Sequence, residues 1–179
     1  MSDWTTSALL HLYARSGRAD AARIQLRHGA DTEIRDVQAL TALLLAVRYN
    51  QLEVLQVLLQ KGARTDASAP LGTNFEYGPE LGTCLHFATE SGHVQILKFL
   101  VIAAALDADD RTSGPQQMTP LHLAARLGRA DIVRFLIGRP EPQYLFDAAH
   151  VEVVEALIHA GAALDVRRSS DWATPLRSV

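Results

Sequence analysis

The chain has 179 residues, of which 48% are hydrophobic and 21% are charged, and its formal net charge at pH 7 is −3. This composition is typical of a soluble protein and provides no excess of basic side chains, so we expect no nucleic-acid partner. The longest apolar stretch, residues 96–106, contains Lys98 and is too short to span a bilayer, so we expect no membrane partner.

A motif that contains a leucine recurs along the chain. The leucine stands at Leu10, Leu43, Leu85 and Leu121. A glycine or asparagine follows it after seven residues, at Gly17, Asn50, Gly92 and Gly128. The first step is 33 residues and the next two are 42 and 36 residues, which predicts a 33-residue repeating unit with insertions.

The most regular copy, residues 118–128, indicates how each unit folds. Thr119 is a favoured helix N-cap and Pro120 is favoured at the first helical position, so we expect a helix to begin here. Gly128 ends this helix in the left-handed conformation, which Asn50 can also adopt in its own unit. A second helix with apolar periodicity then ends at a second glycine in several units: Gly29, Gly62 and Gly161.

These motifs resemble those of the ankyrin repeat family. Residues 119–125 read Thr-Pro-Leu-His-Leu-Ala-Ala, and partial copies stand at residues 83–88, 41–46 and 8–12. The resemblance implies an all-α ankyrin-repeat solenoid of about five helix-turn-helix units joined by β-hairpins or loops. It covers nearly the whole chain, so we expect a single domain over residues 1–179.

The expected units differ in regularity. They span about residues 3–35, 36–67, 78–110, 114–138 and 141–166, with an inserted loop at 68–82 and a terminal stub at 167–179. In the middle units, Leu58, Leu100 and Leu136 are expected to be buried at equivalent places in the second helix. The first unit has Gln25 at this place, which we interpret as part of the polar outer surface of a capping repeat.

The C-terminal end departs most from the repeat. Residues 139–142 read Arg-Pro-Glu-Pro in place of a hairpin, and Ala149 stands where the other units have glycine or asparagine. Residues 174–176 begin a further unit shortly before the chain stops. Either these residues cap the stack, or the chain is a fragment of a longer array, and the sequence leaves both interpretations open.

The inserted loop at 68–82 is the most individual feature of the chain. Glycines and prolines surround Phe75 and Tyr77, so a loop composition carries two aromatic side chains that a loop does not need. The two rings either cover the ends of adjacent helices or contact a partner. In both cases we expect the loop to project from the hairpin side of the stack.

The histidines and the single cysteine do not form a recognisable catalytic or metal site. The resemblance implies that His11, His86 and His122 bond neighbouring backbone groups. Two more histidines follow the end of a first helix and are also expected to be structural: His93 and His150. Cys84 supplies one soft ligand, whereas a zinc site needs three or four ligands. We therefore expect no catalytic residue, no metal and no cofactor.

The resemblance also implies a concave binding face made of hairpin tips and the exposed sides of the first helices. Carried over position by position, it nominates as partner-binding residues Trp4, Arg15, Val37, Gln38, Leu40, Arg48, Tyr49, Phe75, Tyr77, Glu90, Met118 and Arg126. Aromatic and arginine side chains dominate binding energy in interfaces, so these types are the strongest candidates among them.

The sequence thus predicts a monomeric protein–protein interaction module that is not an enzyme. One alternative is an enzyme or small-molecule-binding protein with a pocket between the 68–82 loop and the concave face. Another is a regulatory domain of a larger protein. A lone cysteine excludes an internal disulfide, and the first residues lack a secretory signal, so we expect a cytoplasmic or nuclear location.

Overall fold

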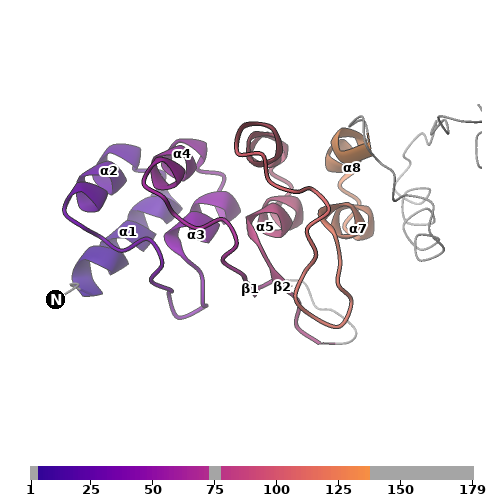
Figure 1. Cartoon of the computed structure of the whole chain (residues 1–179), viewed down its shortest axis with the longest axis horizontal. Coiled ribbons are helices and arrows are strands. Elements are labelled where there is room, and N and C mark those ends of the chain that lie inside the picture. Colours follow the sequence, from indigo (N-terminus) through magenta and orange to yellow (C-terminus); the bar gives the residue numbers. More distant parts are fainter. Residues whose placement is uncertain (1–3, 73–77, 138–179) are drawn as a thin grey trace, which may run out of the picture.

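The computed structural model describes residues 4–72 and 78–137, with side chains described from Ser7 onward, and this part of the chain forms four consecutive helix pairs. The first helices are α1 (Trp4–Ser16), α3 (Ala42–Arg48), α5 (Cys84–Ser91) and α7 (Pro120–Arg126). The second helices are α2 (Ala19–Arg27), α4 (Leu52–Gln60), α6 (Val94–Lys98) with its continuation η1 (Phe99–Ala103), and α8 (Ala130–Ile137). The first helices form one row and the second helices another, and the connecting hairpins extend on the side of the first row (Figure 1). The expected fifth unit and the terminal stub lie outside the described residues.

Threonine side chains begin the first helices of the middle units, as the motif predicts. Thr41 accepts a hydrogen bond from the backbone N–H of Leu44. Thr119 accepts one from the N–H of His122, whose ring bonds back to the N-cap residue. Each pair satisfies backbone donors that a helix N-terminus would otherwise leave free. The chain therefore enters each first helix through a local interaction.

The first helices end at the predicted residues. Gly17, Gly92 and Gly128 have φ angles of +74°, +77° and +65°, and Asn50 has +59°. These are left-handed backbone conformations, which residues other than glycine and asparagine rarely adopt. The prediction of these turns from the repeated spacing is confirmed. The chain reverses there and enters the second helix.

The core follows the stack from one unit to the next. Leu58 and Leu100 are fully buried and Leu136 is buried, so the prediction for these equivalent positions is confirmed. Each first helix packs on the first helix of the next unit, α1 on α3, α3 on α5 and α5 on α7. One continuous hydrophobic core results, and each unit depends on its neighbours for its burial.

The second helix of the third unit changes its winding. After α6, η1 is a π-helix of five residues, and the helix ends before Ala105, which has a φ of +52°. Gly62 is the counterpart of Ala105 and has a φ of +82°. The third unit has one residue more than the second between its two left-handed turns, and a π-helical turn accommodates such an insertion.

The base of the inserted loop is part of the fold. Strands β1 (Ala69–Pro70) and β2 (Leu81–Gly82) pair in antiparallel fashion, with Ala69 opposite Gly82. Leu81 also exchanges two backbone hydrogen bonds with Ser113, at 3.1 and 2.9 Å. A side chain at Gly82 would meet Leu71 and His86 at 2.7 Å, so the packing here requires glycine. The insertion is thus tied to the hairpin of the next unit, while Phe75 and Tyr77 lie outside the described residues.

The first unit is not the polar cap that the sequence suggested. Its outer side exposes Leu9, Leu12 and Ile24, with 37%, 55% and 52% of their surface accessible. Gln25 turns inward, and its side-chain oxygen is buried without a hydrogen-bond partner. The prediction was wrong because one polar residue at a core position says nothing about the residues on the outer side.

Among the residues described, no helix has both the length and the apolar character needed to cross a membrane.

Candidate protein-binding face

Four side chains occupy one repeated position near the C-terminal ends of the first helices. They stand five residues after the motif leucine of each unit, and they are Arg15, Arg48, Glu90 and Arg126. Arg15 and Arg126 are exposed, and Arg48 and Glu90 are half-buried. The position therefore presents a long polar side chain from each of four adjacent units.

The backbone at this position is held by the following unit. The side chain that comes just after each left-handed turn donates a hydrogen bond to the carbonyl of the preceding first helix. Gln51 Nε2 donates to Arg15 O at 3.5 Å. His93 Nε2 donates to Arg48 O at 3.0 Å, and Arg129 Nη2 donates to Glu90 O at 2.8 Å. These bonds occupy carbonyls that the helix leaves unpaired, and they fix the backbone of the repeated position.

Arginine side chains from one unit cover aromatic rings of the next. The Arg15 guanidinium lies 4.8 Å from the centre of the Tyr49 ring, which is itself exposed. The Arg48 guanidinium lies 6.0 Å from the centre of the buried Phe87 ring. Both geometries are those of cation–π contacts. They orient Arg15, Arg48 and Tyr49 on the same side of neighbouring helices.

The inserted loop approaches this side of the stack as well. A side chain placed at Gly72 would lie 3.2 Å from Arg48 Nη2 and 3.7 Å from Glu90 Oε1. Gly72, Arg48 and Glu90 are therefore close together, although they belong to the insertion and to two different helices. The described base of the insertion therefore lies beside two of the nominated residues, Arg48 and Glu90.

The hairpin that precedes the second unit contains three nominated residues, of which two are exposed and the third is buried. Asp36 accepts hydrogen bonds from the backbone N–H groups of Gln38 and Leu40 at 2.8 and 2.9 Å, which fixes a tight turn. Val37 and Gln38 are exposed at its tip. Leu40 is 1% exposed and packs in the core, so its assignment as a contact residue was wrong. Of the three nominated residues in this hairpin, only Val37 and Gln38 are exposed to solvent.

The hairpin that precedes the fourth unit is held together by the carboxylate of Glu80, which belongs to the insertion. Glu80 is fully buried; it accepts a hydrogen bond from the hydroxyl of Thr112 and another, at 2.8 Å, from the N–H of Gln116. Thr112 in turn accepts from the N–H of Met118 at 2.8 Å. Met118 is buried, so its nomination as a contact residue was also wrong. Gln116 accepts a hydrogen bond from Arg126 Nη1 at 3.0 Å, which links this hairpin to the repeated helix-end position.

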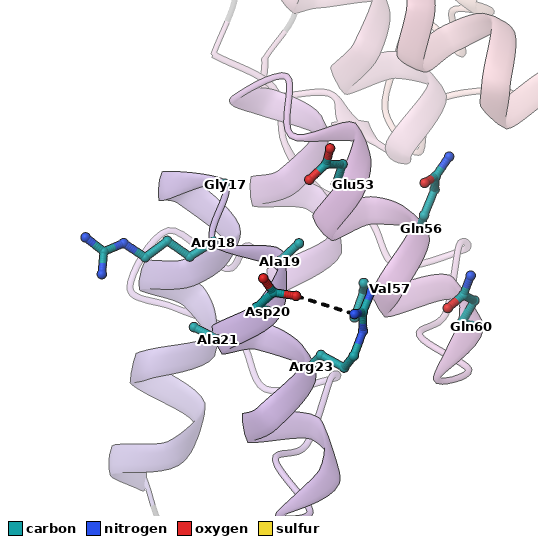
Figure 2. Close-up of a pocket in the computed structure, with 10 residues that line it drawn as sticks. All are labelled: Gly17, Arg18, Ala19, Asp20, Ala21, Arg23, Glu53, Gln56, Val57 and Gln60. Atoms are coloured by element: carbon teal, nitrogen blue, oxygen red, sulfur yellow. Dashed lines mark hydrogen bonds and ion pairs between the residues drawn. The ribbon is translucent and has the colours of Figure 1, made fainter.

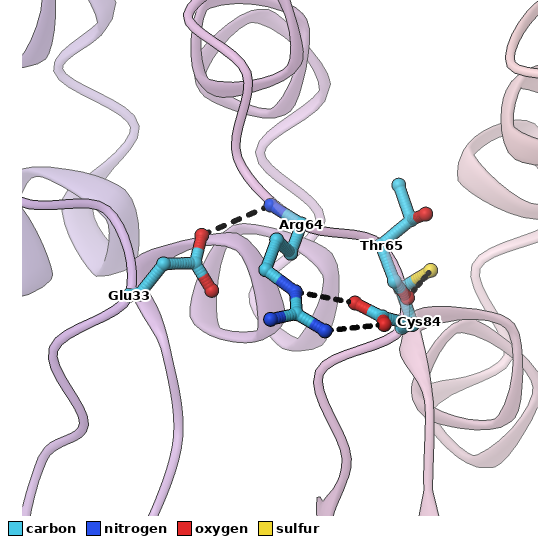
Figure 3. A network of polar contacts seen from close by, with 5 residues as sticks. Glu33, Arg64, Thr65 and Cys84 are labelled. Atoms are coloured by element: carbon cyan, nitrogen blue, oxygen red, sulfur yellow. Dashed lines mark hydrogen bonds and ion pairs between the residues drawn. The ribbon is translucent and has the colours of Figure 1, made fainter.

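The hairpins of adjacent units are also joined to one another (Figure 3). Glu33 Oε1 accepts from the N–H of Arg64 at 3.0 Å, and the Arg64 guanidinium pairs with Asp66 at 2.6 Å. Cys84 Sγ donates to the carbonyl of Thr65 at 3.4 Å. Burial raises the pKa of the Cys84 thiol to about 12, so it is protonated at neutral pH and is a poor nucleophile. Cys84 therefore has a packing role.

The motif histidines bond backbone groups, as the resemblance implied. His11 Nε2 contacts Ile34 O at 3.0 Å, and His86 Nε2 donates to Met118 O at 2.9 Å. His86 Nδ1 accepts from the N–H of Thr83 at 3.2 Å, which requires a neutral ring. Burial lowers the pKa of His86, in agreement with this arrangement. The predicted structural roles of His11, His86 and His93 are confirmed, and His150 lies outside the described residues.

The opposite side of the stack carries shallow grooves between successive second helices. One lies between α2 and α4 and has a volume of about 480 Å³; its rim includes the Asp20–Arg23 ion pair (Figure 2). Two others, of about 470 and 530 Å³, lie between α4 and η1 and between α6 and α8. None of the nominated residues lines these three grooves. Within the described ranges, no group of three or more His, Cys, Asp or Glu side chains could hold a metal ion.

Three nominated aromatic residues remain: Trp4, Phe75 and Tyr77. Trp4 is the first residue of α1. Phe75 and Tyr77 lie outside the described residues. Sequence reasoning missed Glu80, because an acidic residue inside a glycine- and proline-rich insertion is ordinarily expected to be exposed.

Comparison with known proteins agrees with this geometry. A family model described as "Ankyrin repeats (3 copies)" matches residues 2–69 and 71–145. The chain belongs to the ankyrin repeat family. Ankyrin repeats are generally protein-interaction modules.

Two curated ankyrin-repeat relatives are much longer than this chain. The chain is 32% identical over 101 residues to a transient receptor potential cation channel subfamily A member 1 homolog of Caenorhabditis elegans. It is 33% identical over 104 residues to the E3 ubiquitin-protein ligase XBAT33 of Arabidopsis thaliana. The matches cover 56% and 58% of this chain but 8% and 18% of those proteins. The similarity therefore concerns the repeats.

Proposed function

We propose that this ankyrin-repeat protein binds another protein on the face formed by its hairpin tips and the C-terminal ends of its first helices. The observation that carries the proposal is the repeated helix-end position, where Arg15, Arg48, Glu90 and Arg126 follow one another along the stack. Side chains of the following units hold three of their carbonyls. The face thus combines a fixed backbone with varied side chains, which suits specific recognition.

Preorganisation supplies the physical reason for tight binding at such a face. The protein loses less conformational entropy on binding when its contact side chains already have a defined backbone and defined neighbours. Arg15 and Tyr49 are already stacked on each other. They also belong to residue types that are enriched at the energetic centres of interfaces. We propose that this pair is the main anchor of the face, with Val37 and Gln38 contributing at the second hairpin tip.

An alanine scan against a partner obtained by affinity capture tests the proposal. We expect Tyr49→Ala and Arg15→Ala each to weaken binding by about 2 kcal/mol, near thirtyfold, because the two side chains are exposed and already in contact. Trp4, Phe75 and Tyr77 belong in the same scan, since their nomination rests on the sequence. Binding would be measured by calorimetry and folding by circular dichroism.

Two charged residues on the second helices provide matched controls. Glu53 and Lys98 line grooves on the opposite side of the stack. Glu53→Ala and Lys98→Ala should leave affinity for the same partner nearly unchanged. If these two variants weaken binding while Tyr49→Ala and Arg15→Ala do not, the partner uses the other side and the proposed face is wrong.

A further inference from the structure

The outer side of the first unit carries a second apolar surface, separate from the proposed binding face. We call this surface the end face and define it by Leu9, Leu12 and Ile24. Leu12 and Ile24 are more than half exposed, and Leu9 is 37% exposed. Leu9 and Leu12 are three residues apart on α1, so they lie on one side of that helix.

In the other units, the positions of the end face are covered. Leu12 stands two residues after the motif leucine, and its counterparts are fully or almost fully buried: Leu45, Phe87 and Leu123. Leu9 precedes the motif leucine, and its counterparts are buried as well: Ala42, Cys84 and Pro120. The counterparts of Ile24 are buried or half-buried: Val57, Phe99 and Phe135. The exposure of these positions is therefore a property of the first unit and not of the repeat.

The groups that cover these positions come from the preceding unit. Arg48, from α3, lies over the Phe87 ring of the next unit. Lys98, from α6, lies 5.6 Å from the centre of the Phe135 ring of the next unit. The Cys84 thiol bonds the carbonyl of Thr65, which precedes it in the hairpin region. The end face is thus the first-unit copy of a surface that elsewhere packs against a helix pair.

The charged residues beside the end face indicate which kind of partner can pack on it. Helix α2 contains two arginines, Arg23 and Arg27, and one acidic residue, Asp20, which pairs with Arg23. Arg27 and His28 follow Ile24 by three and four residues and are exposed, so they border the end face on α2. Acidic side chains on a partner would complement this border. Two copies of the end face brought together would instead place basic groups near one another.

We propose that the end face docks an amphipathic helix of a partner protein, with apolar side chains at helical spacing and acidic side chains beside them. The apolar side chains cover Leu9, Leu12 and Ile24 in the way that a preceding unit covers their counterparts. The acidic side chains pair with Arg27 and His28. Such a partner extends the inter-unit interface of the stack by one layer.

Two synthetic peptides test this chemistry directly. Each has about 18 residues, or five helical turns. Both carry the same leucines at i, i+3, i+4 and i+7 spacing, and the remaining positions are mainly glutamate in one and mainly lysine in the other. Titration by calorimetry should show at least tenfold tighter binding of the leucine–glutamate peptide. Equal binding of both peptides, or no binding of either, would overturn the proposal.

Variants locate the peptide on the protein. Leu12→Asp combined with Ile24→Asp should weaken binding of the leucine–glutamate peptide at least tenfold. Ile102→Asp is the matched control, because Ile102 is 70% exposed on η1, far along the stack from the first unit. Circular dichroism would verify that both variants fold. An equal loss in the Ile102 variant would show that the peptide binds exposed apolar residues without selectivity, which contradicts the proposal.

Two further measurements distinguish peptide docking on the end face from docking on the proposed binding face and from self-association. Tyr49→Ala should leave peptide affinity unchanged, since Tyr49 belongs to the proposed binding face; a loss there would assign the peptide to that face. Sedimentation of the protein alone should detect no dimer whose formation depends on Leu12, as a comparison with Leu12→Asp would show. Such a dimer would make a second copy the occupant and would overturn the choice of an acidic partner helix.

Discussion

The second and third units bring equivalent leucines into the core by different routes. In the second unit, α4 ends at Gln60, the left-handed turn follows at Gly62, and Leu58 is fully buried. In the third unit, the π-helix η1 absorbs one extra residue, Ala105 adopts the left-handed turn, and Leu100 is fully buried as well. The comparison shows that packing between units determines which side chain is inside. Helix winding and the terminating residue adjust to that requirement.

The hairpins that precede the second and fourth units differ in a related way. Asp36 organises its own hairpin from within, through the N–H groups of Gln38 and Leu40. The hairpin that follows the third unit receives its carboxylate from Glu80, 32 residues away from Thr112. The insertion therefore takes over a task that a local side chain performs elsewhere. This explains why its base is buried although its composition is that of a loop.

The largest effect is expected at the two equivalent leucines. Leu58→Ala and Leu100→Ala should each lower the free energy of unfolding by about 2–5 kcal/mol, because each leaves a cavity in the core. Urea titration would measure both. A much smaller loss for Leu100→Ala would mean that η1 relaxes into the cavity and that the two routes do not give equal packing. Gln25→Ala, in the first unit, should cost little and serves as the control.

The next largest effect concerns the buried carboxylate. Glu80→Ala should cost about 3 kcal/mol, because it leaves the buried hydroxyl of Thr112 and the N–H of Gln116 without their acceptor. Amide exchange at Gln116 and Met118 should become faster. Asp36→Ala should cost less, about 1 kcal/mol, because that hairpin is more exposed. Equal costs for the two variants would contradict the view that the insertion is an internal support.

A smaller effect is expected at the two terminating residues. Ala105→Gly should raise the free energy of unfolding by about 1 kcal/mol, because glycine adopts a positive φ without steric cost. Gly62→Ala should lower it by about 1–2 kcal/mol for the same reason, since no neighbouring atom would obstruct the added methyl group and only the backbone strain remains. Thermal melts of both variants would test the pair. A destabilising Ala105→Gly would show that η1 depends on the alanine side chain.

The smallest effect is a pH dependence of the free energy of unfolding. We expect it in the third unit, which has His86 where the second unit has Leu44. Burial lowers the pKa of His86 from its ordinary value of 6.5, so the ring takes up a proton at a lower pH in the folded protein than in the unfolded chain. Its contribution to stability is therefore present above pH 6.5 and is lost as the pH falls below that value. His86→Gln should show a smaller loss of stability than the wild type between about pH 8 and about pH 5.5. Identical losses would contradict this linkage.

Much of the helical framework could be predicted from local chemistry. Thr119, Pro120 and Gly128 set the beginning and end of a helix through their own hydrogen bonds and backbone preferences. The helix-end position of the candidate face follows from the same repeat, and Arg15 and Tyr49 could be nominated before the fold was known. These features depend on local backbone preferences and on the repeated spacing, so the amino-acid pattern contains them.

Other features depend on contacts between distant parts of the chain. Leu40 and Met118 looked like hairpin-tip contacts, but the direction of a hairpin side chain is set by the neighbouring unit, which buries both. The partner of Glu80, the π-helix at Phe99–Ala103 and the exposed end face likewise arise from how adjacent units pack. Repetition in the amino-acid sequence determined the helices and their order. The tertiary structure decided which side chains remain at the surface, because burial in a stack depends on the neighbour that covers each position.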